Sequence, residues 1–190
     1  MAELLKELLS VSKWINIPNI LSLFRIVLIP VFLYALNLDQ PYGIYIAFGI
    51  LAISYLTDIL DGYIARKHNM TTEVGKILDP LADKATQIVV IIALVVKGLI
   101  PMFVLVIIAV KELLMIGGGA YIYFVLKDSM IPSNIFGKTA TGLFYVSVLL
   151  LLLKVPFAIY LVYLTTAIMV VAFFSYLIAF IKYRKEKKTV

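Results

Sequence analysis

The stretch DILDGYIARKHNMTTEVGKILDPLAD, residues 58–83, gathers four carboxylates in a chain that is otherwise dominated by apolar runs. Asp58 and Asp61 are three residues apart, and Asp79 and Asp83 are four residues apart. On α-helices, both spacings place two side chains on one face, about one turn from each other. We therefore expect two helices, joined by the polar segment between the pairs, to direct both pairs at one point.

Converging carboxylates repel one another, and they persist near a membrane only where cations neutralise them. A site built from oxygen ligands alone favours hard divalent ions, so the stretch predicts Mg²⁺ or Mn²⁺ ahead of zinc. The predicted metal ligands are Asp58, Asp61, Asp79 and Asp83. The chain has no cysteine and a single histidine, which excludes thiolate zinc sites and multi-histidine metal centres.

The composition is that of a membrane protein. Of the 190 residues, 63% are hydrophobic and only 15% are charged, and the apolar excess runs along the whole length. We predict an all-α polytopic membrane protein with one domain over residues 1–190. The net charge of +6 comes from basic residues clustered at the ends of apolar segments. This pattern indicates attraction to the anionic headgroups of a lipid bilayer rather than binding to nucleic acid.

Six apolar stretches are close to the ~20 residues that a membrane-spanning helix needs. They lie near residues 18–38, 43–66, 75–97, 101–126, 135–154 and 157–182. Turn residues such as Pro41, Gly98 and Pro156 separate them, and such short connections predict antiparallel neighbours in one bundle. Ahead of them, residues 2–14 place leucines along one helical face, which predicts an amphipathic helix lying in the membrane interface.

The distribution of lysine and arginine predicts the orientation in the membrane. Most basic residues fall on one side of the six stretches, whereas the other side keeps only Lys97 and Lys154. Cytoplasmic loops are rich in lysine and arginine. We therefore expect a protein of the cell membrane whose carboxylate site lies on the cytoplasmic side. The two termini and the connections 66–76 and 127–138 should lie on the same side.

Small and basic residues accompany the carboxylates. Gly62 and Ala65 leave room for a bulky group to approach the helix backbone, and Gly75 again leaves space before the third stretch. Arg66 lies one turn beyond Gly62, where a guanidinium can hold a phosphate through two hydrogen bonds. These parts indicate a site for a diphosphate ester. The same parts also suit a divalent-cation transporter, but that function predicts carboxylates near the middle of the membrane rather than at one end.

With its spacing, the pattern reads Asp58-x2-Asp61-Gly62-x2-Ala65-Arg66-x8-Gly75-x3-Asp79-x3-Asp83. It resembles the signature of the CDP-alcohol phosphatidyltransferase family, with all eight fixed residues present. Residues 17–25, IPNILSLFR, and residues 75–84, GKILDPLADK, look most like the bacterial phosphatidylglycerophosphate synthase branch. The layout of six helices with both termini inside is also similar to the family, so the resemblance covers nearly the whole chain.

The resemblance implies a metal-dependent enzyme of phospholipid biosynthesis. A phosphatidyl group would pass from CDP-diacylglycerol to an alcohol acceptor directly, without a phosphorylated aspartate, and CMP would leave. One or two Mg²⁺ or Mn²⁺ ions would bind Asp58, Asp61 and Asp79. Asp83 would complete the metal cluster and act as the general base on the acceptor hydroxyl. The residues implied for CDP-diacylglycerol binding are Gly62, Ala65, Arg66, Gly75, Asn19 and Ser22. The family is commonly homodimeric, so a homodimer is expected.

The acceptor is less strongly indicated. The cations available for a phosphorylated acceptor are Arg25, Lys84, Lys111 and Lys138. The branch that the chain resembles carries Arg-Glu and then a further arginine on its fourth helix, whereas this chain has Lys111-Glu112 followed by glycines at 117–119. Lysine does not reproduce a two-pronged arginine clamp. We expect glycerol 3-phosphate first, with transfer to phosphatidylglycerol (as in cardiolipin synthesis), inositol phosphate or serine as alternatives.

Overall fold

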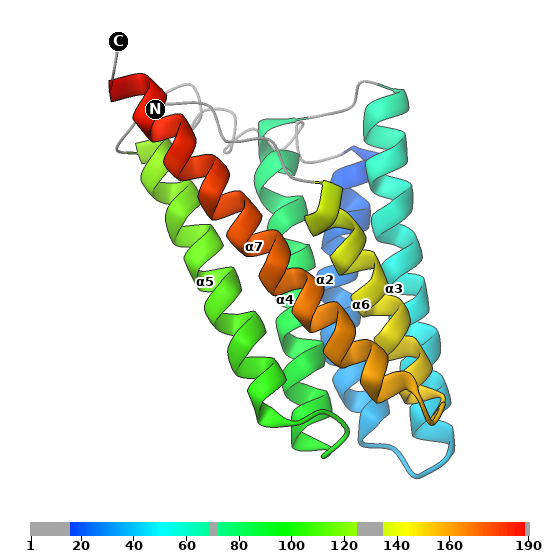
Figure 1. Ribbon diagram of the computed structural model, residues 1–190. Helices are drawn as coiled ribbons and strands as arrows, with labels where there is room; N and C mark the ends of the chain where they lie inside the picture. The colour runs from blue at the N-terminus through cyan, green and yellow to red at the C-terminus, as the bar shows by residue number, and fades with distance from the viewer. Residues whose placement is uncertain (1–15, 69–71, 125–134, 189–190) are drawn as a thin grey trace. The chain divides into compact units, whose positions relative to one another are not determined.

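The computed structural model describes residues 16–68, 72–124 and 135–188, and all regular structure in these ranges is α-helical. The helices are α2 (Ile17–Leu36), α3 (Tyr42–Lys67), α4 (Glu73–Val96), α5 (Met102–Phe124), α6 (Ile135–Leu152) and α7 (Ala158–Lys188) (Figure 1). The predicted all-α class is therefore confirmed. The amphipathic helix predicted for residues 2–14 lies outside the described residues.

The helix bounds agree with the six predicted stretches to within a few residues, except at the end of α7. This helix ends at Lys188 rather than near residue 182. The hydropathy pattern stops where the apolar residues stop, but helical hydrogen bonds do not require apolar side chains. The lysine, arginine and glutamate residues of this tail are good helix formers, so the helix continues through them.

Helix α2 shows how local sequence sets the ends of these elements. The side chain of Asn16 accepts a hydrogen bond from the backbone N–H of Asn19 at 2.8 Å, which caps the first turn. At the other end, the Asn37 side chain donates to the carbonyl of Leu33 at 2.9 Å.

The turn between α4 and α5 contains Gly98 with a φ of 70°, a conformation that favours glycine. The predicted break at Gly98 is thus confirmed.

In the described part of the chain, three helices are long and apolar enough to cross a membrane: α2, α3 and α7. Large aromatic and aliphatic side chains are also exposed on the outer faces of the helices. Those at least 68% exposed are Tyr34, Tyr42, Val96, Leu113 and Tyr160. Exposed apolar faces of this extent are typical of contact with lipid. The protein is therefore a membrane protein, and the crossing of all six helices stays a prediction.

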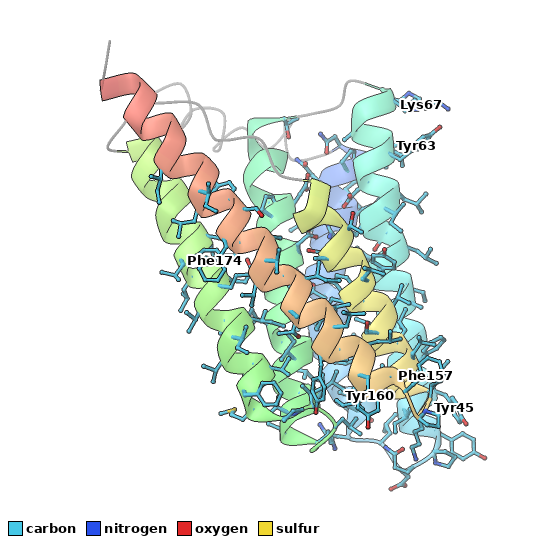
Figure 2. The ribbon with its side chains drawn as sticks, in the orientation of Figure 1. Tyr45, Tyr63, Lys67, Phe157, Tyr160 and Phe174 are labelled. Atoms are coloured by element: carbon cyan, nitrogen blue, oxygen red, sulfur yellow. The ribbon has the colours of Figure 1, made fainter. Side chains whose placement is uncertain are left out.

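Helix α3 carries aromatic side chains near both of its ends, as Figure 2 shows for Tyr45 and Tyr63. Both are more than half exposed, and the ammonium of Lys67 lies 5.3 Å from the centre of the Tyr63 ring. Aromatic rings gather where a membrane meets water, and lysine extends its charge toward the aqueous side there. This arrangement supports a membrane-spanning α3.

The chain divides into two compact units, the first ending at Leu94 and the second beginning at Val95. In the first unit, α2 packs against α3, with Phe32 and Leu51 fully buried. In the second unit, α7 packs against both α5 and α6, with Phe144 and Val162 fully buried. A single domain over the whole chain stays a prediction.

Candidate active site

The first unit brings both predicted carboxylate pairs together around a polar face of α2. One pair comes from the second half of α3 and the other from the first half of α4. Between the pairs lie Ser22 and Arg25, which are three residues apart on α2 and therefore share one face of that helix. Only 2% of the surface of Arg25 and none of the surface of Ser22 is exposed. The sequence predicted the convergence of the carboxylates but not these two side chains at its centre.

The guanidinium of Arg25 binds three of the four carboxylates. One terminal nitrogen donates to Asp58 at 2.5 Å and also to Asp83, while the other donates to Asp61 at 2.7 Å. Such charge-assisted hydrogen bonds are among the strongest contacts that side chains make. Two of the three partners are on α3 and one is on α4, so a single side chain of α2 joins three helices.

Ser22 links the fourth carboxylate to the others. Its hydroxyl lies 2.6 Å from an oxygen of Asp79 and 3.3 Å from an oxygen of Asp61. Because a hydroxyl donates a single hydrogen, the shorter contact with Asp79 is the main bond. Ser22 was predicted to bind CDP-diacylglycerol, and the structure places it inside the carboxylate cluster.

The carboxylates differ in their access to solvent. The side chain of Asp61 is 5% exposed, whereas those of Asp58 and Asp83 are 32% and 37% exposed. Asp61 is therefore an internal anchor of the cluster. Asp58 and Asp83 present oxygens to a molecule that approaches from outside.

A second polar contact joins the start of α2 to the start of α4. The Asn19 amide donates to the hydroxyl of Thr72 at 3.3 Å, and that hydroxyl accepts the backbone N–H of Gly75 at 3.0 Å. A Cβ added at Gly75 would lie 2.7 Å from the Asn19 side-chain oxygen, which is too close. Asn19 therefore lies close against Gly75, and the role of Gly75 in nucleotide binding stays a prediction. Sequence reasoning did not single out Thr72, although a threonine directly before a helix is a common cap.

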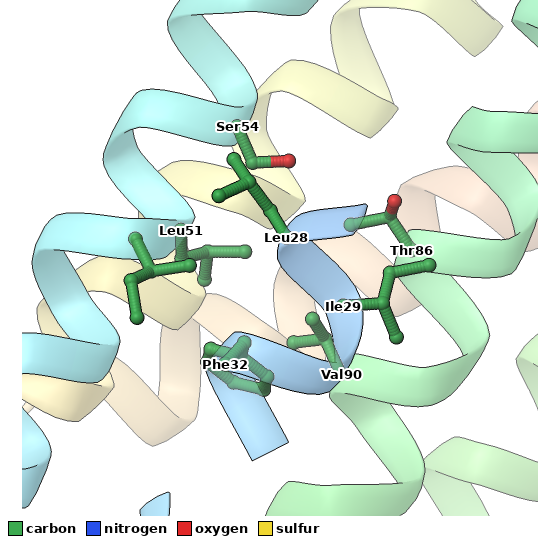
Figure 3. A pocket seen from close by; sticks show the side chains of 8 residues that line it. Leu28, Ile29, Phe32, Leu51, Ser54, Thr86 and Val90 are labelled. Atoms are coloured by element: carbon green, nitrogen blue, oxygen red, sulfur yellow. The ribbon is translucent and has the colours of Figure 1, made fainter. Parts of the chain in front are cut away.

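Next to the carboxylate cluster, α2, α3 and α4 surround a small pocket (Figure 3). Apolar side chains such as Phe32 and Val90 line much of it, together with the hydroxyl-bearing Ser54 and Thr86. Ser54 precedes Asp58 by one helical turn, and Thr86 follows Asp83 by about one turn, so these hydroxyls lie next to the carboxylates along their helices. The Thr86 hydroxyl is buried without a hydrogen-bond partner in the described part of the chain.

The four carboxylates suit a hard divalent cation by chemistry, because they supply only oxygen ligands and lie within reach of the same two side chains. Within residues 16–68, 72–124 and 135–188, however, no three carboxylate or histidine groups are arranged to hold one ion. The Arg25 guanidinium lies between Asp58, Asp61 and Asp83 instead. The predicted set of metal ligands therefore stays a prediction.

The remaining predicted site residues are distributed over both units. Gly62 and Ala65 lie on α3 beyond the first carboxylate pair, and Lys84 follows Asp83 on α4. The side chains of Arg66 and Lys138 lie outside the described part. Lys111 belongs to the second unit, where its ammonium lies 2.5 Å from the carboxylate of Glu112.

The sequence pattern of the CDP-alcohol phosphatidyltransferase family matches residues 15–178, which include every residue of the carboxylate cluster. The chain belongs to this family. Family membership identifies the protein as a phosphatidyltransferase, and it favours this activity over the transport of divalent cations. The predicted resemblance is thereby confirmed.

Relatives within the family extend over most of the chain. The CDP-diacylglycerol–glycerol-3-phosphate 3-phosphatidyltransferase of Rickettsia bellii is 34% identical over 175 residues, which make up 91% of this chain and 96% of the relative. The Rickettsia felis protein of the same name is 32% identical over 173 residues, with 91% and 96% covered. A probable phosphatidylglycerophosphate synthase of Mycobacterium tuberculosis is 36% identical over 129 residues, covering 66% of this chain and 60% of the relative.

Proposed function

We propose that this phosphatidyltransferase transfers the phosphatidyl group of CDP-diacylglycerol to glycerol 3-phosphate and releases CMP, as a step of phospholipid biosynthesis. The observation that carries the proposal is the meeting of Asp58, Asp61, Asp79 and Asp83 around one face of α2. The acceptor is supported by the names of the Rickettsia relatives, which align with 91% of this chain.

Asp83 is the proposed general base. Its side chain is 37% exposed, so an acceptor hydroxyl can approach it from outside the bundle. Asp83 takes the proton of that hydroxyl while the hydroxyl oxygen forms a bond to the phosphorus that carries diacylglycerol. The bond from this phosphorus to the CMP oxygen breaks in the same direct displacement, and CMP leaves.

The four carboxylates are also the proposed ligands for one or two Mg²⁺ or Mn²⁺ ions. Bound there, a divalent ion supplies a Lewis acid that offsets charge on the diphosphate. Gly62, Ala65 and Arg66 follow the first carboxylate pair along α3, and we assign them to the nucleotide and diphosphate. Arg25 is a cation in direct contact with Asp58, Asp61 and Asp83, and we assign it to the acceptor phosphate.

The proposed setting is the cytoplasmic membrane, with six spanning helices, both termini and the active site on the cytoplasmic side, and a homodimeric assembly. The bias of lysine and arginine along the chain supports this orientation. The apolar outer faces of α2, α3 and α7 support the membrane setting. The homodimer rests on the family resemblance.

A second candidate acceptor is phosphatidylglycerol, which would give cardiolipin. Lys111 stands where the resembled branch has an arginine, and its ammonium is held by Glu112 at 2.5 Å. A paired lysine is a weaker clamp for the phosphate of glycerol 3-phosphate than a free guanidinium.

The test is CMP release by the purified protein from CDP-diacylglycerol, with Mg²⁺ or Mn²⁺ and separate acceptors. The acceptors are glycerol 3-phosphate, phosphatidylglycerol, inositol phosphate and serine. We expect release with glycerol 3-phosphate only, and its loss when EDTA removes the metal. Release with phosphatidylglycerol alone would replace the first acceptor by the second. Full activity after EDTA treatment would overturn the metal assignment.

A further inference from the structure

Arg25 makes more contacts with the carboxylate cluster than a residue that only binds substrate would need. Its guanidinium reaches Asp58, Asp61 and Asp83, and the side chain is 2% exposed. A buried arginine that pairs with three carboxylates neutralises charge that would otherwise be unfavourable at this depth. Arg25 therefore offsets negative charge of the carboxylates, as a bound metal ion would.

Two observations indicate that Arg25 does not complete this site. In the ion pairs of the described residues, Asp58, Asp61 and Asp83 share the single positive charge of Arg25, so these three carboxylates can attract a further cation. The remaining side-chain nitrogen of Arg25, Nε, is buried without a hydrogen-bond partner in the described residues. An unpartnered buried N–H is unfavourable, so the present contacts leave the guanidinium only partly satisfied.

We propose that the Arg25 guanidinium and a divalent cation compete for the same carboxylate oxygens, so that metal binding releases Arg25 from Asp58 and Asp83. These are the two exposed carboxylates of its three partners, whereas Asp61 is buried with it. The inference rests on the proposed metal-dependent function. It assigns Arg25 a positioning role: the residue balances the charge of the carboxylates and becomes available to a phosphate group once metal has bound.

The competition predicts the direction of a change in metal affinity. In an EDTA-treated protein, we would measure Mn²⁺ binding from the loss of the electron paramagnetic resonance signal of free Mn²⁺. The Arg25→Gln variant should bind Mn²⁺ with a Kd roughly tenfold or more below that of the wild type, because the competing contacts of the guanidinium with Asp58 and Asp83 are gone. Arg25→Lys should fall between the two, since lysine keeps the charge but contacts fewer carboxylates.

Lys67→Gln is the matched control. This change also removes one positive charge, at the last residue of α3. The Lys67 ammonium, however, contacts the Tyr63 ring rather than the carboxylate cluster. Its Kd for Mn²⁺ should stay within about twofold of the wild type, because an exposed charge is screened by salt. A Kd for Arg25→Gln equal to or above that of the wild type would overturn the inference.

Thermal unfolding provides a second measurement. In EDTA, Arg25→Gln should unfold at a lower temperature than the wild type, and saturating Mn²⁺ should raise its Tm more than it raises the Tm of the wild type. If Arg25→Gln does not fold without metal, Arg25→Lys provides the affinity test, and a Kd no lower than that of the wild type would again overturn the inference.

The two proposals fail in different ways. If Mn²⁺ binds the wild type no better than an Asp58→Asn and Asp61→Asn double variant, the metal assignment itself is wrong. If binding depends on these aspartates but not on Arg25, the competition alone is wrong.

Discussion

Asp83 and Asp61 have different positions in the cluster, although both bind Arg25. Asp61 is buried and shares Ser22 with Asp79, whereas Asp83 is the most exposed of the three carboxylates that Arg25 holds. A general base must reach a hydroxyl of a diffusing substrate, and an internal anchor need not. This difference supports Asp83 as the base and Asp61 as a structural member of the cluster.

The Asp83→Asn variant should lose turnover by about 10²- to 10⁴-fold, the usual contribution of a general base. Binding of CDP-diacylglycerol should be largely kept. Stability should be unchanged or slightly raised, because the change removes one of several like charges while Arg25 keeps Asp58 and Asp61. The measurements are CMP release, binding of radiolabelled CDP-diacylglycerol, and thermal unfolding in detergent.

Asp39→Asn is the control for this change, since Asp39 is an exposed residue outside the helices and away from the cluster in sequence. It should behave as the wild type in all three measurements. Normal turnover by Asp83→Asn would show that another group takes the proton.

At the scale of helices, the junction between α2 and α4 depends on a close approach at Gly75. The added Cβ of Gly75→Ala would lie 2.7 Å from Asn19 Oδ1 and 3.2 Å from Thr72 Oγ1. The Asn19 amide is buried and bonded to Thr72, so it cannot move aside freely. We expect a loss of about 1–3 kcal/mol in unfolding free energy, as for other overpacked sites, together with reduced turnover.

A control and a double variant make this prediction specific. Gly49→Ala places the same methyl group on α3 where nothing lies within 4 Å, so stability should be unchanged or slightly higher. Asn19→Ala should restore part of the stability lost in Gly75→Ala, because it removes the atom that clashes. Equal losses in the single and double variants would mean that the damage at Gly75 does not act through Asn19.

The sequence predicts the helices of this fold well because each needs a long apolar run and a short polar break. It also predicts that Asp58 pairs with Asp61 and that Asp79 pairs with Asp83, since helical spacing alone decides which side chains share a face. It does not predict the contact of Arg25 with Asp58 and Asp83. That contact depends on how α2 is rotated and shifted against α3 and α4, which hydropathy does not specify. Nor does it predict that Asn19 lies against Gly75, because Asn19 belongs to another helix.

For the whole molecule, the length and composition of each helix decide whether it can cross the bilayer. Helices α2, α3 and α7 meet the requirements of length and apolar composition in the described part of the chain. Helix α4 carries Asp79, Asp83 and Lys84 in its first half. If α4 spans the membrane, its charged half has to lie at one surface of the bilayer and its apolar half, up to Val96, has to lie within the lipid.

The absence of cysteine from the sequence makes this topology directly measurable. Single cysteines introduced at Asp39, His68 and Lys97 occupy exposed positions after α2, α3 and α4. In intact cells, a membrane-impermeant maleimide should label Asp39→Cys and Lys97→Cys, and it should label His68→Cys only after lysis. Labelling of Lys97→Cys from the inside alone would show that α4 turns back without crossing. The carboxylate site would then lie on a re-entrant helix, and the orientation derived from the basic residues would hold only as far as α3.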